Sequence, residues 1–406
     1  MKFSQLFALL LFCVTFITAC DDEEPSIMLE VPTTYAFERE GTSTVSFTGQ
    51  TDRLAMGNEI GDALKDFTKT EADLAAMYAN AGPNGEDVAP YTQASLNEST
   101  KSVRGKTAAS RDYFSTNTAT AAEIRAEFDG WISGQVYEVF PAANVAAEPG
   151  QAGQIADGSA VRYVNAQGLE YDQLIIKGLI GALMTDQMLN NYLGTSVLDE
   201  ASNVADNDAG TVADGKPYTT MEHKWDEAYG YLFGLSPDAA SPLNTLGNDD
   251  DFLNKYLGRV ENDEDYAGIA QRIFDAFKRG RAAIVAGEYE ERDAQADIIR
   301  EEVSKVIAIR AVYYLMQGKF NLEATPAAYG AAFHDLSEGY GFIYSLQFTR
   351  RPGTDAPYFS REEVATLLAE LTTPTNGLWE VTPGTLESMA NQITTRFGLS
   401  LDEAGS

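Results

Sequence analysis

The hydrophobic and polar positions of the chain repeat with helical spacing from about residue 50 onward. In RLAMGNEIGDALKDF, Leu54, Ile60 and Leu64 fall near one face of a helix, and TEADLAAMY opens with a threonine followed by acids, as helix starts do. The same spacing predicts longer helices at 120–139, 169–194, 219–233, 263–286, 293–317, 326–347, 360–371 and 384–398. Most of the chain is therefore expected to be helical.

Residues 35–49 and the connections between helices break this pattern. TSTVSF within 35–49 is β-branched and alternating, which predicts a short strand or an extended arm. Loops are predicted where Gly, Pro, Asn and Asp gather, at 141–160, 200–217 and 236–251. Because the last of these loops precedes a fresh series of helices, we expect one helical domain over 35–400, with halves at about 35–245 and 246–400.

The first twenty residues, MKFSQLFALLLFCVTFITAC, are a basic start, an apolar run and small residues before a cysteine. The run is too short to span a bilayer, so it predicts a signal peptide over 1–19. The end, ITAC, resembles the bacterial lipobox, which implies that Cys20 carries lipid. An acidic linker follows over 20–34, and its DDEE resembles a retention signal for the outer surface; a solvated linker is the alternative. We expect a lipid-anchored outer-membrane protein facing the cell exterior.

The charge balance narrows the classes of partner. The chain carries 29 Lys and Arg against 61 Asp and Glu, a net charge of −32 at pH 7, and no basic run longer than a pair. Binding phosphate backbones requires a basic face, so nucleic acid is excluded as a partner. Cys13 leaves with the signal peptide and Cys20 carries lipid, so cysteine chemistry is excluded in the folded part.

The chain has two histidines, and their surroundings match. HKWDEAYGYLF and HDLSEGYGFIY share the pattern H-x-x-x-E-x-Y-G. The match aligns His223, Glu227, Tyr229 and Gly230 with His334, Glu338, Tyr340 and Gly341. We infer an internal duplication.

Residues four apart share a helix face, so each His projects together with its Glu. An imidazole and a carboxylate can bind a transition metal, and two duplicated helices that meet would bring two such pairs together. The predicted metal ligands are His223, Glu227, His334 and Glu338. The predicted ligand-binding residues are these four with Asp226, Tyr229 and Tyr340. The alternative is that each Glu only fixes the tautomer of its His inside a helical core.

The sequence around these histidines resembles a known family. HKWDEAYGYLFG is similar to the imelysin signature, and YAFEREGTSTVSFTGQTDRLAMGNEI and FKRGRAAI resemble DUF4856, a lipoprotein family grouped with the imelysin-like proteins. The likeness covers about 35–400. This sequence departs from the imelysin signature in two ways. Met221 and Ala332 stand where the signature has Gly. The acid that the signature has three residues after the His is Asp226 in one copy, and Ser337 replaces it in the other.

This resemblance implies an all-α fold of two pseudo-repeated helical bundles with a short extended N-terminal arm. It also implies a site where the His helices meet, a role in iron or haem acquisition, iron, zinc or haem as the bound group, and an outer-membrane transporter as partner. Imelysin was classed as a metallopeptidase, so a metal-dependent peptidase is one alternative, although no His-Glu-x-x-His helix is present. The other alternative is a scaffold lipoprotein with structural histidines. The sequence does not determine the oligomeric state.

Overall fold

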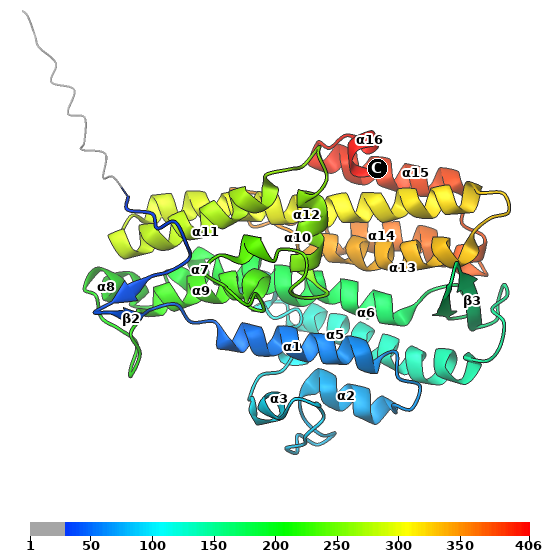
Figure 1. Cartoon of the computed structure of the whole chain (residues 1–406), viewed down its shortest axis with the longest axis horizontal. Helices are drawn as coiled ribbons and strands as arrows, with labels where there is room; N and C mark the ends of the chain where they lie inside the picture. The colour runs from blue at the N-terminus through cyan, green and yellow to red at the C-terminus, as the bar shows by residue number, and fades with distance from the viewer. Residues whose placement is uncertain (1–28) are drawn as a thin grey trace, which may run out of the picture.

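The computed structural model describes residues 29–406, and nearly all of its regular structure is helical (Figure 1). Helices make up 60% of the chain, beside two short two-stranded sheets, so the prediction of a mainly helical fold is confirmed. The signal peptide, Cys20 and the first part of the acidic linker lie outside the described residues. Across the described part, no helix combines the length and the apolar character needed to cross a membrane.

An extended arm precedes the first long helix, as predicted. In the arm, β1 (Glu38–Arg39) and β2 (Thr42–Ser43) form an antiparallel hairpin. Helix α2 then begins at the predicted threonine: the Thr70 hydroxyl accepts a hydrogen bond from Asp73 N, and the Asp73 carboxylate accepts one from Thr70 N, which satisfies two free N–H groups. The helices of this part are α1 (Thr48–Ala63), α2 (Glu71–Ala79), α3 (Ala94–Glu98), η1 (Arg104–Lys106), α4 (Arg111–Phe114), α5 (Thr118–Gly134), η2 (Gln135–Val139) and η3 (Phe140–Ala142).

A second hairpin occupies part of the loop predicted over 141–160. Strand β3 (Gly153–Asp157) pairs antiparallel with β4 (Ala160–Val164), and Gly158 in the two-residue turn has a φ of +58°. The two-residue loop Gly158–Ser159, with glycine at its first position, is a typical hairpin signal. The hairpin packs against helix α13 at one end of the molecule (Figure 1).

The predicted helix at 169–194 is continuous but changes its winding. It starts as α6 (Tyr171–Leu179) and continues through two π-helical segments, η4 (Ile180–Thr185) and η5 (Met188–Tyr192). The two π-helical segments carry fully buried polar side chains, among them Thr185 and Asn190. Helices α7 (Thr195–Leu198), α8 (Asn203–Asp208) and α9 (Thr220–Phe233) follow.

The long helix α12 (Tyr289–Glu323) has α11, α13 and α15 packed along it (Figure 1). Its 35 residues, at a rise of roughly 1.5 Å each, give a length of about 52 Å. The other elements after α9 are η6 (Pro242–Asn244), α10 (Leu253–Glu261), α11 (Ile269–Ala286), α13 (Tyr329–Ser345), η7 (Leu346–Phe348), α14 (Arg361–Thr372), η8 (Gly377–Trp379), α15 (Pro383–Phe397) and α16 (Leu401–Ala404).

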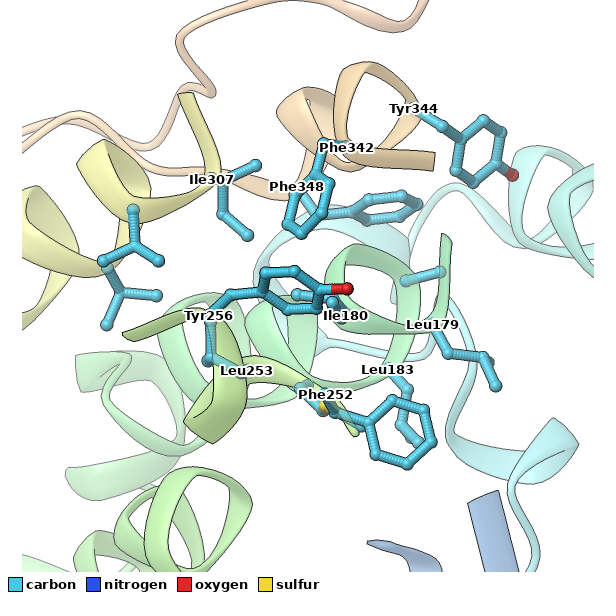
Figure 2. Close-up of a cluster of buried hydrophobic side chains, with 14 of the residues drawn as sticks. Leu179, Ile180, Leu183, Phe252, Leu253, Tyr256, Ile307, Phe342, Tyr344 and Phe348 are labelled. Carbon is cyan, nitrogen blue, oxygen red and sulfur yellow. The ribbon is translucent and has the colours of Figure 1, made fainter. Parts of the chain in front are cut away.

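A buried apolar cluster joins α10 to α6, η4, α12 and α13 (Figure 2). The ring of Tyr256 meets that of Phe342 edge to face at 4.7 Å between centroids, and Leu183 and Ile307 are fully buried beside them. Burying each such side chain contributes about 1.5–3 kcal/mol. The cluster fixes α10 across the other helices, and this position of α10 creates the cavity described below.

Candidate functional site

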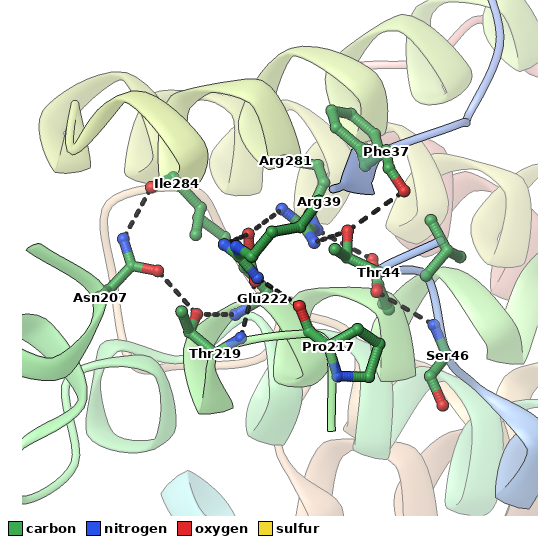
Figure 3. A network of polar contacts seen from close by, with 12 residues as sticks. Phe37, Arg39, Thr44, Ser46, Asn207, Pro217, Thr219, Glu222, Arg281 and Ile284 are labelled. Carbon is green, nitrogen blue, oxygen red and sulfur yellow. Dashed lines mark hydrogen bonds and ion pairs between the residues drawn. The ribbon is translucent and has the colours of Figure 1, made fainter. Parts of the chain in front are cut away.

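The first His helix, α9, belongs to a buried ionic network around Arg281 of α11 (Figure 3). The Arg281 side chain is fully buried, and it pairs with Glu222 at 3.1 Å and with Asp226 at 3.1 Å. Arg281 also donates to the Thr44 hydroxyl of the arm at 3.0 Å, while Arg39 of the arm pairs with Glu222 at 3.0 Å. The network therefore clamps the arm between α9 and α11.

Asp226, a predicted ligand-binding residue, is fully buried in this network. Its carboxylate accepts hydrogen bonds from the Tyr35 hydroxyl at 2.7 Å and from Ser46 N at 3.2 Å, besides pairing with Arg281. Burial raises the pKa of Asp226 to about 6, although Arg281 opposes this shift. Tyr229 is equally buried, stacked on Tyr35 at 3.7 Å. Neither side chain is accessible to a ligand.

His223 is half-buried and faces the arm. Its Nδ1 lies 2.9 Å from the Ser46 carbonyl oxygen, which can only accept, so Nδ1 carries the proton. The ring stacks on Tyr218, and Nε2 is 3.9 Å from Glu227, which is also paired with Lys224 at 2.8 Å. Burial lowers the pKa of His223, although the charge of Glu227 opposes this shift. The predicted His–Glu pair thus exists in the first copy, but it lies next to a lysine.

His334, on α13, pairs with a residue that sequence spacing did not indicate. Its Nδ1 lies 3.2 Å from the carboxylate of Glu170, which is buried just before α6. Burial would lower the pKa of His334, but the hydrogen bond and charge of Glu170 raise it above its usual value. Burial raises the pKa of Glu170 to about 7, against the effect of His334. The two groups therefore hold a proton between them at neutral pH.

Glu338, one turn after His334, is also buried and pairs with Lys177 of α6. The Lys177 Nζ is 3.3 Å from its Oε1, and the Tyr256 hydroxyl of α10 donates to the same oxygen at 3.2 Å. Burial would raise the pKa of Glu338, but the charges of Lys177 and His334 lower it to about 2. The carboxylate is therefore ionised at every physiological pH.

A cavity of about 250 Å³ opens at this point between α1, α6, α10 and α13. We call it the His334 pocket. It has four basic and four acidic side chains in its lining, together with His334: Lys65, Lys177, Lys255 and Arg259, and Asp62, Asp172, Asp251 and Glu338. In a chain with a net charge of −32, this balance of charges makes the pocket suited to a ligand that is itself dipolar.

Two hydrogen-bond acceptors lie beside the pocket, and they differ in access. The amide oxygen of Asn58 is buried and has no hydrogen-bond partner among the described residues. Asp172 is partly buried, accepts a hydrogen bond from its neighbour Gln173 at 2.9 Å, and has its pKa raised by burial despite the charge of Lys177. A ligand with N–H or O–H groups would donate to Asp172.

Tyr340, the remaining predicted site residue, lies on another face of α13. It lines a second cavity, of about 290 Å³, between α5, α13 and α14. Trp131 meets Tyr340 and Tyr344 edge to face there, and the Tyr344 hydroxyl donates to Glu127 at 2.6 Å. The H-x-x-x-E-x-Y-G pattern therefore contributes to two cavities in its second copy.

The two histidines do not meet in the structure. Among the described residues, His223 and His334 share no hydrogen-bond or ion-pair partner, and α9 and α13 lie toward opposite ends of the long axis in Figure 1. Across residues 29–406, no group of three or more His, Cys, Asp or Glu side chains is arranged to hold a metal ion. The Lys177 ammonium already neutralises Glu338, the carboxylate that would join His334 as a ligand. The predicted set of four ligands therefore does not fit one metal centre.

Glu170, Asp172, Lys177 and Arg259 are the site residues that sequence reasoning missed. Glu170 is 164 positions from His334, and nothing in its local sequence marks it as a partner. One signal was available: acids at 170 and 172 stand at the start of a long apolar helix, where buried carboxylates are unusual.

Comparison with known proteins returned one family. The model described as "Domain of unknown function (DUF4856)" matches residues 32–400. No curated protein and no solved structure matches the chain.

Proposed function

The chain belongs to the DUF4856 family, and from its own residues we propose that it is a lipid-anchored lipoprotein that binds a small dipolar ligand in the His334 pocket. The description of the family names no activity, so the function is inferred from the residues of this chain. The proposed anchor is lipid on Cys20, with the protein on the outer membrane and facing the cell exterior. The signal sequence, its lipobox-like end and the acid run support this location. The observation that carries the binding role is the convergence of His334, Glu338 and Lys177 on one cavity.

The lining defines the class of ligand. Charged groups that are already paired, as Glu338 is with Lys177, offer directional hydrogen bonds to a ligand without adding a net charge to the pocket. Asp172 calls for a donor on the ligand. The volume lies below the roughly 300–1,000 Å³ of pockets for drug-sized ligands. A small zwitterion or polyol fits these conditions, and a haem macrocycle is too large.

We further propose that the protein takes part in iron or haem acquisition, with an outer-membrane transporter as partner, and that the fold consists of two imelysin-like bundles. These points rest on the resemblance around the two histidines. The two glycines that the pattern aligns both make close contacts, which supports a repeat. A Cβ on Gly230 would lie 2.5 Å from Phe47 of the arm, and a Cβ on Gly341 would lie 2.4 Å from Lys177. Each His helix thus uses its glycine for a close contact.

No observation favours the peptidase alternative. A metallopeptidase needs a bound metal with an open position for water, held by about three protein ligands. The described residues provide no such set. Binding without catalysis is therefore the function that the site supports best.

Native mass spectrometry of the protein, purified without chelator from its own cells, tests the binding role. We expect a small-molecule adduct in the wild type that Glu338→Gln loses and His223→Ala keeps. His223→Ala is the matched control, because it removes the same residue from the other copy of the pattern. Wild-type protein without an adduct, or an adduct kept by Glu338→Gln, would refute the assignment of the pocket.

Growth of a deletion strain tests the iron role separately. With haem or ferric iron as the sole iron source, the deletion strain should grow slowly, and wild type and His223→Ala should restore growth while Glu338→Gln should not. Normal growth of the deletion strain on both sources would remove the iron role and leave the binding role intact.

A further inference from the structure

Arg310, near the middle of α12, is a buried cation without a counter-ion. Only 6% of the residue is exposed. Its guanidinium lies over the rings of Tyr313, Tyr314 and Tyr256, at 4.0, 4.7 and 5.7 Å from the ring centroids. Among the described residues, no carboxylate pairs with it and no acceptor takes its protons; Nε and Nη2 are buried and unpartnered. Buried arginines are normally paired, so a partner from outside the chain is indicated.

Arg310 lines an open cavity of about 490 Å³ on the α10 and α12 side of the molecule. Arg259 of α10 brings a second guanidinium, which donates to the Tyr314 hydroxyl at 2.8 Å. The remaining lining residues are Asn262, Asp263, Tyr313 and Ser406. Asp263, the one acidic side chain among them, accepts a hydrogen bond from Asp265 N at 3.0 Å in its own turn. Two arginines therefore face one acidic side chain, Asp263, in a chain with a large excess of acid.

We propose that this cavity binds a small oxyanion, either a carboxylate or a phosphate group, between Arg259 and Arg310. Nη1 is the nitrogen of Arg310 left accessible and without a partner among the described residues. Guanidinium groups recognise planar carboxylates and phosphates through charge-assisted hydrogen bonds. The tyrosine rings hold Arg310 in place, so little side-chain entropy is lost when the anion binds. The site is independent of the His334 pocket, apart from Arg259, which lines both cavities.

Isothermal titration of the purified chain with sodium phosphate and with sodium succinate, at constant ionic strength against chloride, tests the site. We expect saturable binding at one site for at least one of the two anions, and the comparison identifies whether phosphate or carboxylate is preferred. Arg310→Met should weaken binding at least tenfold and Arg310→Lys less. The control Arg272→Gln, which removes an exposed arginine of α11, should bind as the wild type does. No saturable binding of either anion, or unchanged binding by Arg310→Met, would overturn the proposal.

A thermal melt in anion-free buffer separates binding from a structural role. An unpaired buried charge opposes folding, so Arg310→Met should melt at the wild-type temperature or above it, and only the wild type should gain stability when the anion is added. A lower melting temperature for Arg310→Met before any anion is added would show that Arg310 acts through the tyrosine rings alone, and would refute the site.

Discussion

Replacing Lys177 with methionine tests the buried ion pair in the His334 pocket. The pKa of Glu338 falls from 4.5 to about 2, because the charges of Lys177 and His334 outweigh burial. A difference of about 2.5 in pKa corresponds to about 3.4 kcal/mol, at roughly 1.36 kcal/mol for each pH unit. Lys177 makes the larger of the two contributions. We therefore expect Lys177→Met to lower the free energy of unfolding by about 3 kcal/mol at pH 7, within the range of roughly 3–5 kcal/mol for breaking a buried pair.

Urea unfolding followed by circular dichroism measures this loss, and pH gives it a signature. The pKa of Glu338 is lower in the folded state, so its stabilising contribution is complete above about pH 4.5 and disappears as the pH falls through about 2. In Lys177→Met the carboxyl takes up a proton at a higher pH, so the deficit should shrink at pH 4. Lys177→Met/Glu338→Leu should regain most of the stability. A loss below about 1 kcal/mol, or a double variant as unstable as the single one, would refute this reasoning.

Three further predictions concern the rest of the chain. Arg281→Met leaves the buried Asp226 carboxylate without a cation and Glu222 with Arg39 alone, and should cost about 3–5 kcal/mol, with faster tryptic cleavage in the arm detected by mass spectrometry; an unchanged cleavage rate would contradict the clamp. A Cβ at Gly341 would lie 2.4 Å from an α6 atom, so Gly341→Ala should lower the free energy of unfolding, measured by chemical denaturation, by about 1–3 kcal/mol. The control Gly130→Ala, whose Cβ would have no atom within 4 Å, should not lower it. Burial raises the pKa values of Glu170 and Asp250 to about 7, so the folded state binds more protons than the unfolded state from about pH 4 to 7. Calorimetry should therefore give a higher melting temperature at pH 5 than at pH 8, and the reverse order would refute the assignment.

Helices were predictable where the local sequence contains both their apolar face and their cap. The range 219–233 was predicted and α9 is observed over Thr220–Phe233, because Thr219 and Glu222 form a capping box at its start. The β3–β4 hairpin was not predicted. Its short strands pack against α13, and the sequence of a short segment does not reveal packing against a helix that is distant in the chain. The π-helical winding after Leu179 was equally hidden, since its two segments have only 6 and 5 residues, too few to change the spacing of the apolar positions.

The site was predictable only as far as one helix face extends. His334 and Glu338 were found from their spacing, but their partners Glu170 and Lys177 come from another helix, so the packing of α6 on α13 decides which residues pair. For the same reason Asp226 was predicted to bind a ligand, although it is enclosed by Arg281 of α11. A single sequence shows which groups share a face, and it does not show which helix covers that face.

The clamped arm also sets a limit on distance. Tyr35 is almost fully buried and its N–H donates to Ala240 O, so the folded body begins there. If Cys20 carries lipid, the linker between the lipid and the folded body is about fifteen residues long. At roughly 3.3–3.6 Å per residue, this linker spans at most about 50 Å. In that case the point where the arm enters the folded body stays within that distance of the membrane surface. A pull on this linker would load Tyr35 first, and its hydrogen bonds to Ala240 O and to the Asp226 carboxylate would pass the load to the loop after α9 and to α9 itself.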